Sequence, residues 1–95
     1  MPEPVFAVTR LRADESDVPS LLIAVNELLA LLRQRHGFRD GAVGRAADEP
    51  GLLALWTTWD GVGAYRRALG ATEVKIAGAP VWLHAVDEPG VYLTD

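Results

Sequence analysis

The stretch that decides the fold is Leu52–Trp59, which reads LLALWTTW. Alternate residues of a strand point to opposite faces of the sheet, so these eight side chains divide into two sets. The sets are Leu53, Leu55, Thr57 and Trp59 on one face, and Leu52, Ala54, Trp56 and Thr58 on the other. An antiparallel strand with one face in water alternates apolar and polar residues, and neither of these sets is hydrophilic. We therefore expect a β-strand whose two faces are both covered.

The segments around this strand carry the patterns of further strands and helices. Asp48-Glu49-Pro50-Gly51 before it indicates a turn, and Asp60 after it is expected to cap a helix that ends at Gly70. The other expected elements are a strand over 5–12, a helix from Pro19 to about His36, a weaker strand over 38–47, a short helical turn over 72–77, a strand over 81–86 and a short strand over 91–93. The order βαββαβ predicts one α+β domain over residues 1–95, a ferredoxin-like antiparallel sheet with both helices on one face.

Both helices have an apolar stripe suited to that single face. In the first, apolar residues recur every three or four positions at Val18, Leu21, Val25, Leu28 and Leu32, and Gly37 is expected to end it in a left-handed conformation. In the second, Val62, Tyr65 and Leu69 share a face. Two helices cover only one side of the sheet, so the opposite face needs another cover.

A second copy of the chain is the expected cover. The chain has 95 residues, of which 49% are hydrophobic, and a domain of this size has little interior in which to bury them. Packing of one sheet on another is an established way to bury two apolar sheet faces. We expect a homodimer through the sheet face.

Composition and charge exclude several other classes. There is no cysteine, the net charge is -4, and no basic cluster exceeds the pair Arg66-Arg67, so neither a disulfide framework nor nucleic-acid binding is expected. No apolar stretch approaches the roughly 18 residues of a membrane span, and the first residues do not resemble a signal peptide. A cytoplasmic protein without a membrane partner is expected.

Residues 36–81, HGFRDGAVGRAADEPGLLALWTTWDGVGAYRRALGATEVKIAGAPV, resemble the antibiotic biosynthesis monooxygenase family of dimeric α+β barrels. The matching pieces are Gly37-Phe38 at the second strand, the apolar third strand ending at Trp59, Ala64-Tyr65 on the following helix, and Asp87-Glu88-Pro89 before the last strand. The resemblance implies a dimeric barrel. It also implies membership of a group that includes cofactor-free oxygenases of aromatic polyketides, heme-degrading oxygenases and proteins without a known reaction.

The resemblance carries Trp59 and Tyr65 across as site residues and disfavours heme degradation. Heme-degrading members combine an Asn on the first strand, a Trp at the end of the third and a His on the next helix. Trp59 matches that Trp, but residues 5–12 contain no Asn and residues 60–76 contain no His. Quinone-forming members are thought to place Trp, Asn, Tyr and Arg side chains around an aromatic substrate.

Three residues are candidates for catalysis, and each has a structural alternative. Trp59 either stacks on a flat aromatic ligand or is a core tryptophan whose indole N–H bonds a carbonyl. His84, expected on one strand face with Trp82 and Val86, is either an acid or base for a phenolic proton or a hydrogen-bonded core histidine. Tyr65 either serves the site or belongs to the core.

Parity and charge constrain the other candidates. Trp56 lies on the face opposite to Trp59, so the two cannot line one cavity. His36 is expected to interact with the end of the first helix. Arg66 and Arg67 are either a solvated helix face or partners for an anionic substrate group or a carboxylate.

Two functions remain open. One is a cofactor-independent monooxygenase acting on a small aromatic or polyketide-like substrate. The substrate itself reduces O₂, so the protein needs a dry cavity rather than a metal. The other is a non-catalytic dimeric module that binds a small hydrophobic ligand or a protein partner. No metal-ligand cluster and no phosphate-binding loop is present in the sequence, so no cofactor is expected.

Overall fold

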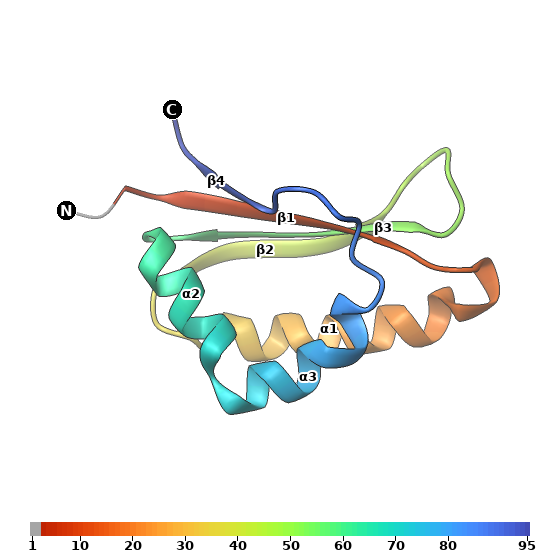
Figure 1. Ribbon diagram of the computed structural model, residues 1–95, viewed down its shortest axis with the longest axis horizontal. Coiled ribbons are helices and arrows are strands. Elements are labelled where there is room, and N and C mark those ends of the chain that lie inside the picture. The colour runs from red at the N-terminus through yellow and green to blue at the C-terminus, as the bar shows by residue number, and fades with distance from the viewer. Residues whose placement is uncertain (1–2) are drawn as a thin grey trace.

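The computed structural model describes residues 3–95, in which a four-stranded antiparallel sheet lies over three helices (Figure 1). The strands are β1 (Val5–Arg12), β2 (Phe38–Arg45), β3 (Leu52–Trp59) and β4 (Val91–Leu93). The helices are α1 (Val18–Arg33), α2 (Val62–Gly70) and α3 (Thr72–Trp82), and a short 3₁₀ turn, η1 (Glu15–Asp17), precedes α1. The sheet order β2-β3-β1-β4 is that of the ferredoxin-like fold, so the predicted fold class is confirmed.

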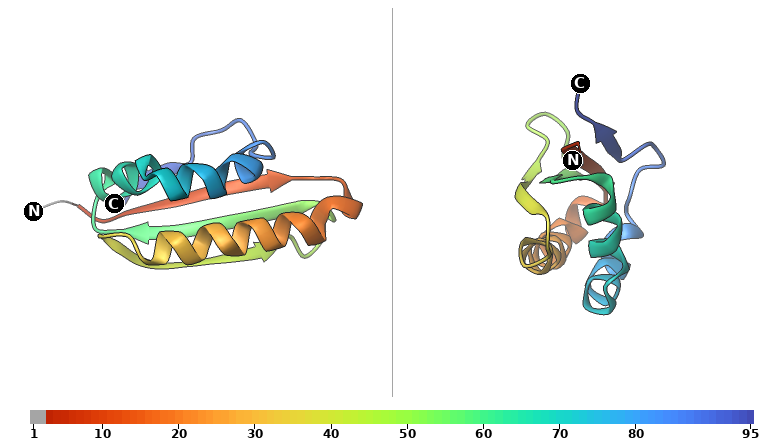
Figure 2. Two further views of the ribbon diagram at one scale, coloured as in Figure 1. Left: turned by 90° about the horizontal axis from the view of Figure 1, so that it is seen from below. Right: turned by 90° about the vertical axis from the view of Figure 1, so that its left-hand side faces the viewer.

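All three helices lie on the same side of the sheet. Figure 2 shows α1 alongside the α2–α3 pair, with the strands above them. The expected helical turn over 72–77 is in fact the longer helix α3, so three helices rather than two cover this face. α1 ends at Arg33, three residues before the expected end, and Gly37 has the expected left-handed conformation with a φ of +89°.

The expected strand over Val81–Val86 is wrong. α3 continues to Trp82 because Val74, Gly78 and Val81 form a helical row that is buried in the core. Beyond the helix the chain does run beside β1, where the Arg12 N–H donates to the His84 carbonyl (2.8 Å). Only Ala85 forms a bridge with β1, so no strand develops before β4, and Trp82, His84 and Val86 do not share a strand face.

The expected cap at Asp60 is also wrong. Gly61 occupies the N-cap position of α2 and no side chain caps the helix. Asp60 instead accepts a hydrogen bond from the Arg39 guanidinium at 2.6 Å, which ties the end of β3 to the beginning of β2. Within α2, the fully buried positions are Ala64 and Ala68, while Val62, Tyr65 and Leu69 are partly buried against the core.

The core lies between the sheet and the helices. One of the two side-chain sets of β3 faces this core and is entirely buried; it consists of Leu53, Leu55, Thr57 and Trp59. α1 covers them with Leu21, Val25, Leu28, Leu29 and Leu32. The hydrophobic row predicted for the first helix is therefore its core face.

The other face of the sheet is open in the single chain. Trp56 is 37% exposed there, and the rings of Phe6 and Tyr92 stack beside it with centroids 5.3 Å apart. Trp56 and Trp59 thus lie on opposite faces, as predicted. No helix covers this face within residues 3–95 (Figure 1). None of the helices described is long and apolar enough to cross a membrane.

Candidate functional site

Trp59 ends β3 in the middle of the core. Its side chain is 0% exposed, and its indole N–H donates to the Thr57 hydroxyl at 2.8 Å. Both residues lie on the helix-covered face of β3, two positions apart, which brings the hydroxyl to the ring. The acceptor is a side-chain hydroxyl rather than the expected carbonyl. The indole is therefore fully satisfied inside the chain.

Three rings from three elements meet at this point, and we call Phe38, Trp59 and Tyr65 the aromatic cluster. Phe38 begins β2 and meets Trp59 edge to face, with centroids 5.2 Å apart. Tyr65 lies on α2 with its ring 5.7 Å from that of Trp59. Such pairs contribute about 0.5–1.5 kcal/mol each beyond the burial of their area. The structure therefore brings two of the predicted site residues, Trp59 and Tyr65, into contact.

Tyr65 is placed to donate rather than to accept a proton. Its side chain is partly buried, and this burial raises the pKa of the phenol above its ordinary value of 10.0. The hydroxyl stays protonated at neutral pH because a buried phenolate would lose its hydration. A hydrogen-bond donor beside a flat aromatic ring is useful for holding an oxygen-bearing aromatic molecule.

A pocket of about 230 Å³ adjoins the aromatic cluster. It is lined by His36, Gly37, Asp60, Gly61, Gly63, Ala64 and Arg67. Gly37, Asp60 and Ala64 are the chain neighbours of the three ring residues, although none of the rings is part of the lining. A Cβ on Gly37 would lie 2.5 Å from the Ala64 Cβ, which shows how closely this wall is packed.

Three residues of the pocket are charged or titratable, namely His36, Asp60 and Arg67, and the sequence patterns did not predict that they lie together. His36 was expected to serve only the end of the first helix, and Arg67 was expected on a solvated helix face or beside an anionic group. The sequence signal for His36 is the adjacent Gly37, and the signal for Arg67 is Gly63 one helical turn before it. Neither glycine has a side chain to fill the space.

His84 lies at the other end of the molecule. One ring nitrogen, Nδ1, is 3.0 Å from the Arg12 carbonyl oxygen, whereas Trp59 pairs with Val5 at the opposite end of β1. Seven residue steps along a strand separate these points by roughly 23 Å. The three residues predicted for one site are therefore in two places, and a substrate atom beside Trp59 is out of reach of His84.

No group of His, Asp or Glu side chains in residues 3–95 is arranged to hold a metal ion. The lining of the pocket includes an imidazole, a carboxylate and a guanidinium, while the Trp59 ring is fully buried in the core. Side chains of these types can exchange protons or hydrogen bonds with a bound molecule.

Several solved structures share this fold, although no family model and no curated protein matches the sequence. SnoaB, a cofactor-independent oxygenase from Streptomyces nogalater, superposes with a TM-score of 0.79 at 18% identity, over 98% of this chain and 94% of that one. A candidate antibiotic biosynthesis monooxygenase from Caulobacter crescentus CB15 gives 0.82 at 17% identity, over 99% and 90%. A Bacteroides thetaiotaomicron protein of unknown function gives 0.88 at 11% identity, over 99% and 100%.

These similarities extend over nearly the whole of each chain. The fold expected from the resemblance is therefore confirmed: the chain is built like structures named as antibiotic biosynthesis monooxygenases. At identities below 20% the similarity establishes the architecture, and a fold alone does not determine an activity.

Proposed function

We propose that this protein is a cofactor-independent monooxygenase of the antibiotic biosynthesis type, acting on a small aromatic or polyketide-like substrate. The observation that carries the proposal is the contact between Trp59 and Tyr65, beside a pocket with an imidazole, in the fold of a named cofactor-independent oxygenase. Each part is what such chemistry requires: a flat apolar surface, a hydrogen-bond donor and a proton acceptor.

In the proposed reaction an activated CH₂ group of the substrate becomes a carbonyl. A base removes a proton, and the electron-rich anion reduces O₂. One oxygen atom enters the product, and the other leaves as water with the two hydrogens of the CH₂ group. The substrate supplies all the electrons, so the protein contributes only binding, deprotonation and exclusion of water.

The roles follow from the positions. Trp59 supplies the ring on which the substrate stacks, Tyr65 donates a hydrogen bond to its oxygen, and His36 accepts the proton on a ring nitrogen, since histidine is the side chain most often used as a general base. The closed Gly37–Ala64 wall separates the pocket from Trp59, so the proposal requires the beginning of α2 to move aside when substrate binds.

Oxygen consumption with anthrone-type substrates, which carry such a CH₂ group, tests this proposal. The wild type should consume one O₂ for each quinone formed. His36→Gln should lower the rate roughly 100-fold, as for loss of a general base, and Trp59→Phe should lower it up to roughly tenfold. Trp82→Phe is the matched tryptophan control and should keep the wild-type rate.

His84→Gln separates the two histidines. A rate loss for His84→Gln with none for His36→Gln would overturn the placement of the site at the aromatic cluster, because His84 lies at the other end of β1. Absence of oxygen consumption by the wild type across the panel would rule out the oxygenase.

A second candidate function is a non-catalytic dimeric module that binds a small hydrophobic ligand or a protein partner. It is favoured by the burial of Trp59, which has no exposed surface and whose only polar atom is already bonded to Thr57. Under this alternative, aromatic compounds bind without oxygen consumption and Trp59→Phe leaves their affinity unchanged.

We also propose that the protein works as a homodimer through the open face of the sheet. The exposed aromatic residues Phe6, Trp56 and Tyr92 lie on this face, and the strand register places Val8 and Ala54 on it as well. A second copy would remove these side chains from water, with a gain of about 25 cal/mol for each Å² of apolar surface.

A further inference from the structure

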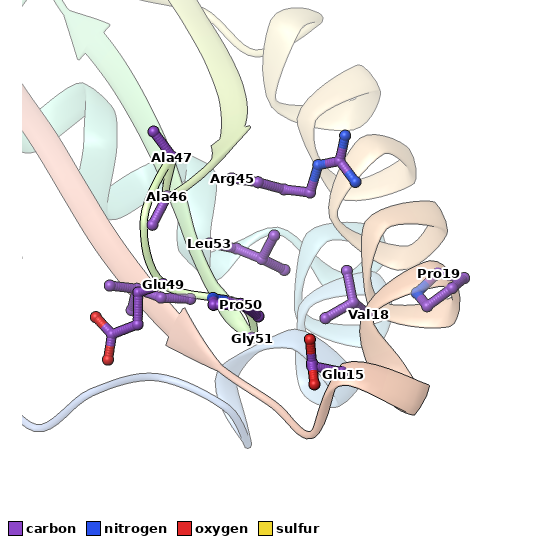
Figure 3. Close-up of a pocket in the computed structure, with 11 residues that line it drawn as sticks. Glu15, Val18, Pro19, Arg45, Ala46, Ala47, Glu49, Pro50, Gly51 and Leu53 are labelled. Carbon is purple, nitrogen blue, oxygen red and sulfur yellow. The ribbon is translucent and has the colours of Figure 1, made fainter.

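A groove of about 530 Å³ lies between the beginning of α1 and the hairpin that joins β2 to β3 (Figure 3). Its volume is within the roughly 300–1,000 Å³ typical of small-molecule sites. The groove borders Leu52 and Leu53 at the start of β3, whereas Trp59 ends that strand. Six residue steps from Leu53 to Trp59 correspond to roughly 20 Å, so this site is separate from the aromatic cluster.

The hairpin wall of the groove is held in place by the last residue of β1 and the residue that follows it. The Ala13 N–H donates to the Gly51 carbonyl at 2.9 Å, and Arg12 pairs with Glu49 at 2.8 Å. Gly51 has a φ of +87°, and any Cβ there would collide with the Ala13 carbonyl oxygen. The groove is thus preformed, which lowers the entropic cost of binding a ligand.

The lining of the groove is apolar in the middle and charged at its ends. In Figure 3 the side chains of Val18 and Leu53 lie between Arg45, which points toward α1, and Glu15. Arg45 pairs with Leu53 across the strands, so its stem extends along the same helix-covered face.

Arg45 is the cation available to a ligand. The ion pairs formed among residues 3–95 occupy Glu49 with Arg12 but do not include Arg45. A guanidinium presents two parallel N–H groups that match the two oxygens of a carboxylate. Glu15 at the other end repels a carboxylate and would direct it toward Arg45.

We propose that this groove binds a small amphipathic monocarboxylate, with its apolar body on Val18 and Leu53 and its carboxylate on the Arg45 guanidinium. The ligand class follows from one unpaired guanidinium at the end of an apolar trough. Oxygen consumption at the aromatic cluster does not enter the proposal, so either can fail alone.

An NMR titration with octanoate, and with octan-1-ol as its uncharged counterpart, tests the proposal. Octanoate should shift the amide signals of Val18 and Leu53. Arg45→Met keeps the apolar stem and should weaken octanoate binding about tenfold, the effect of losing a charged hydrogen-bonding partner. Octan-1-ol binding should be unchanged by this substitution, which also shows that the variant is folded.

Two further variants complete the design. Glu15→Gln removes the repelling charge and should tighten octanoate binding roughly two- to threefold. Arg66→Met, which removes an exposed arginine on α2, should have no effect. The proposal is overturned if octanoate causes no shifts, if its shifts map to Phe6 and Trp56, or if Arg45→Met binds octanoate as the wild type does.

Discussion

The indole N–H of Trp59 donates a hydrogen bond to the Thr57 hydroxyl, within the buried core beside the aromatic cluster. Thr57 is 2% exposed, so water cannot replace its hydroxyl. Thr57→Val keeps the shape of the side chain and leaves the indole unpaired. It should lower the free energy of unfolding by about 1–3 kcal/mol. Thr57→Ser, which retains the hydroxyl, should lower it by less than about 1.5 kcal/mol, and equal losses in urea denaturation would contradict this role.

Gly37 combines a left-handed backbone with a close approach to Ala64. Gly37→Ala should destabilise the protein by about 2–4 kcal/mol, since it adds both backbone strain and a collision. In an Ala64→Gly background the collision is relieved, and the loss should fall to about 1–2 kcal/mol. Gly44→Ala, whose Cβ would meet no atom within 4 Å, is the control. An identical loss in both backgrounds would show that the Gly37–Ala64 contact is not the cause.

At the scale of single residues, proximity along the chain decided which candidate residues lie together, and their roles stay predictions. Trp59 and Tyr65 belong to consecutive elements, so a strand followed directly by a helix was enough to bring them together. The position of His84 depends on where α3 ends and how the chain returns to β1, which are long-range properties. His36 lines the pocket because of tertiary packing, which the sequence pattern does not predict.

At the scale of elements, the segment after α3 shows how a strand pattern can mislead. VWLHAV alternates like a strand, and Gly78 and Pro80 before it are typical helix breakers. Burial of Val74, Gly78 and Val81 outweighs that preference and extends the helix to Trp82. A Cβ on Gly78 would lie 2.5 Å from the Trp82 indole nitrogen, so the glycine is needed for packing within the helix.

The segment between α3 and β4 is held to β1 by a two-point ion pair. The Arg10 Nε donates to Glu88 at 2.8 Å, and hydrogen bonding to Arg10 lowers the pKa of this carboxyl below its ordinary value of 4.5. A carboxyl with a lowered pKa in the folded state stabilises it above about pH 4.5, and this contribution is lost as the pH falls through the lowered value. The pair is exposed, so we expect a local effect on this segment.

An NMR titration of the Glu88 side chain measures this directly. Its midpoint should lie below 4.5 in the wild type and return toward 4.5 in Arg10→Met. A wild-type midpoint at or above 4.5 would show that the ion pair does not form in solution.

At the scale of the whole molecule, a single chain covers only one of the two hydrophobic faces of β3. The helices cover the set that contains Leu53 and Trp59, and the set that contains Trp56 faces outward. The sequence was sufficient to predict β1, β2, β3 and the helices α1 and α2, because local patterns specify them, but it placed a strand where α3 ends. Which set meets the helices depends on tertiary packing, and the cover of the other face stays a prediction.

A charge in the middle of the open face should prevent self-association. Trp56→Glu replaces a partly exposed indole that the proposed interface would bury, and an unpaired buried carboxylate is costly. We expect a folded monomer by light scattering. Ile76→Glu is the matched control, since Ile76 is 71% exposed on α3 at the helical side, and this variant should remain dimeric. Dissociation of both variants to the same extent would place the interface elsewhere.

We propose that LLALWTTW needs a second copy of the chain to cover its outer face. Light scattering of the wild-type protein at micromolar concentration tests it most directly. We expect a particle of twice the chain mass of 10.3 kDa. A stable particle of 10.3 kDa, with the open sheet face in water, would contradict it.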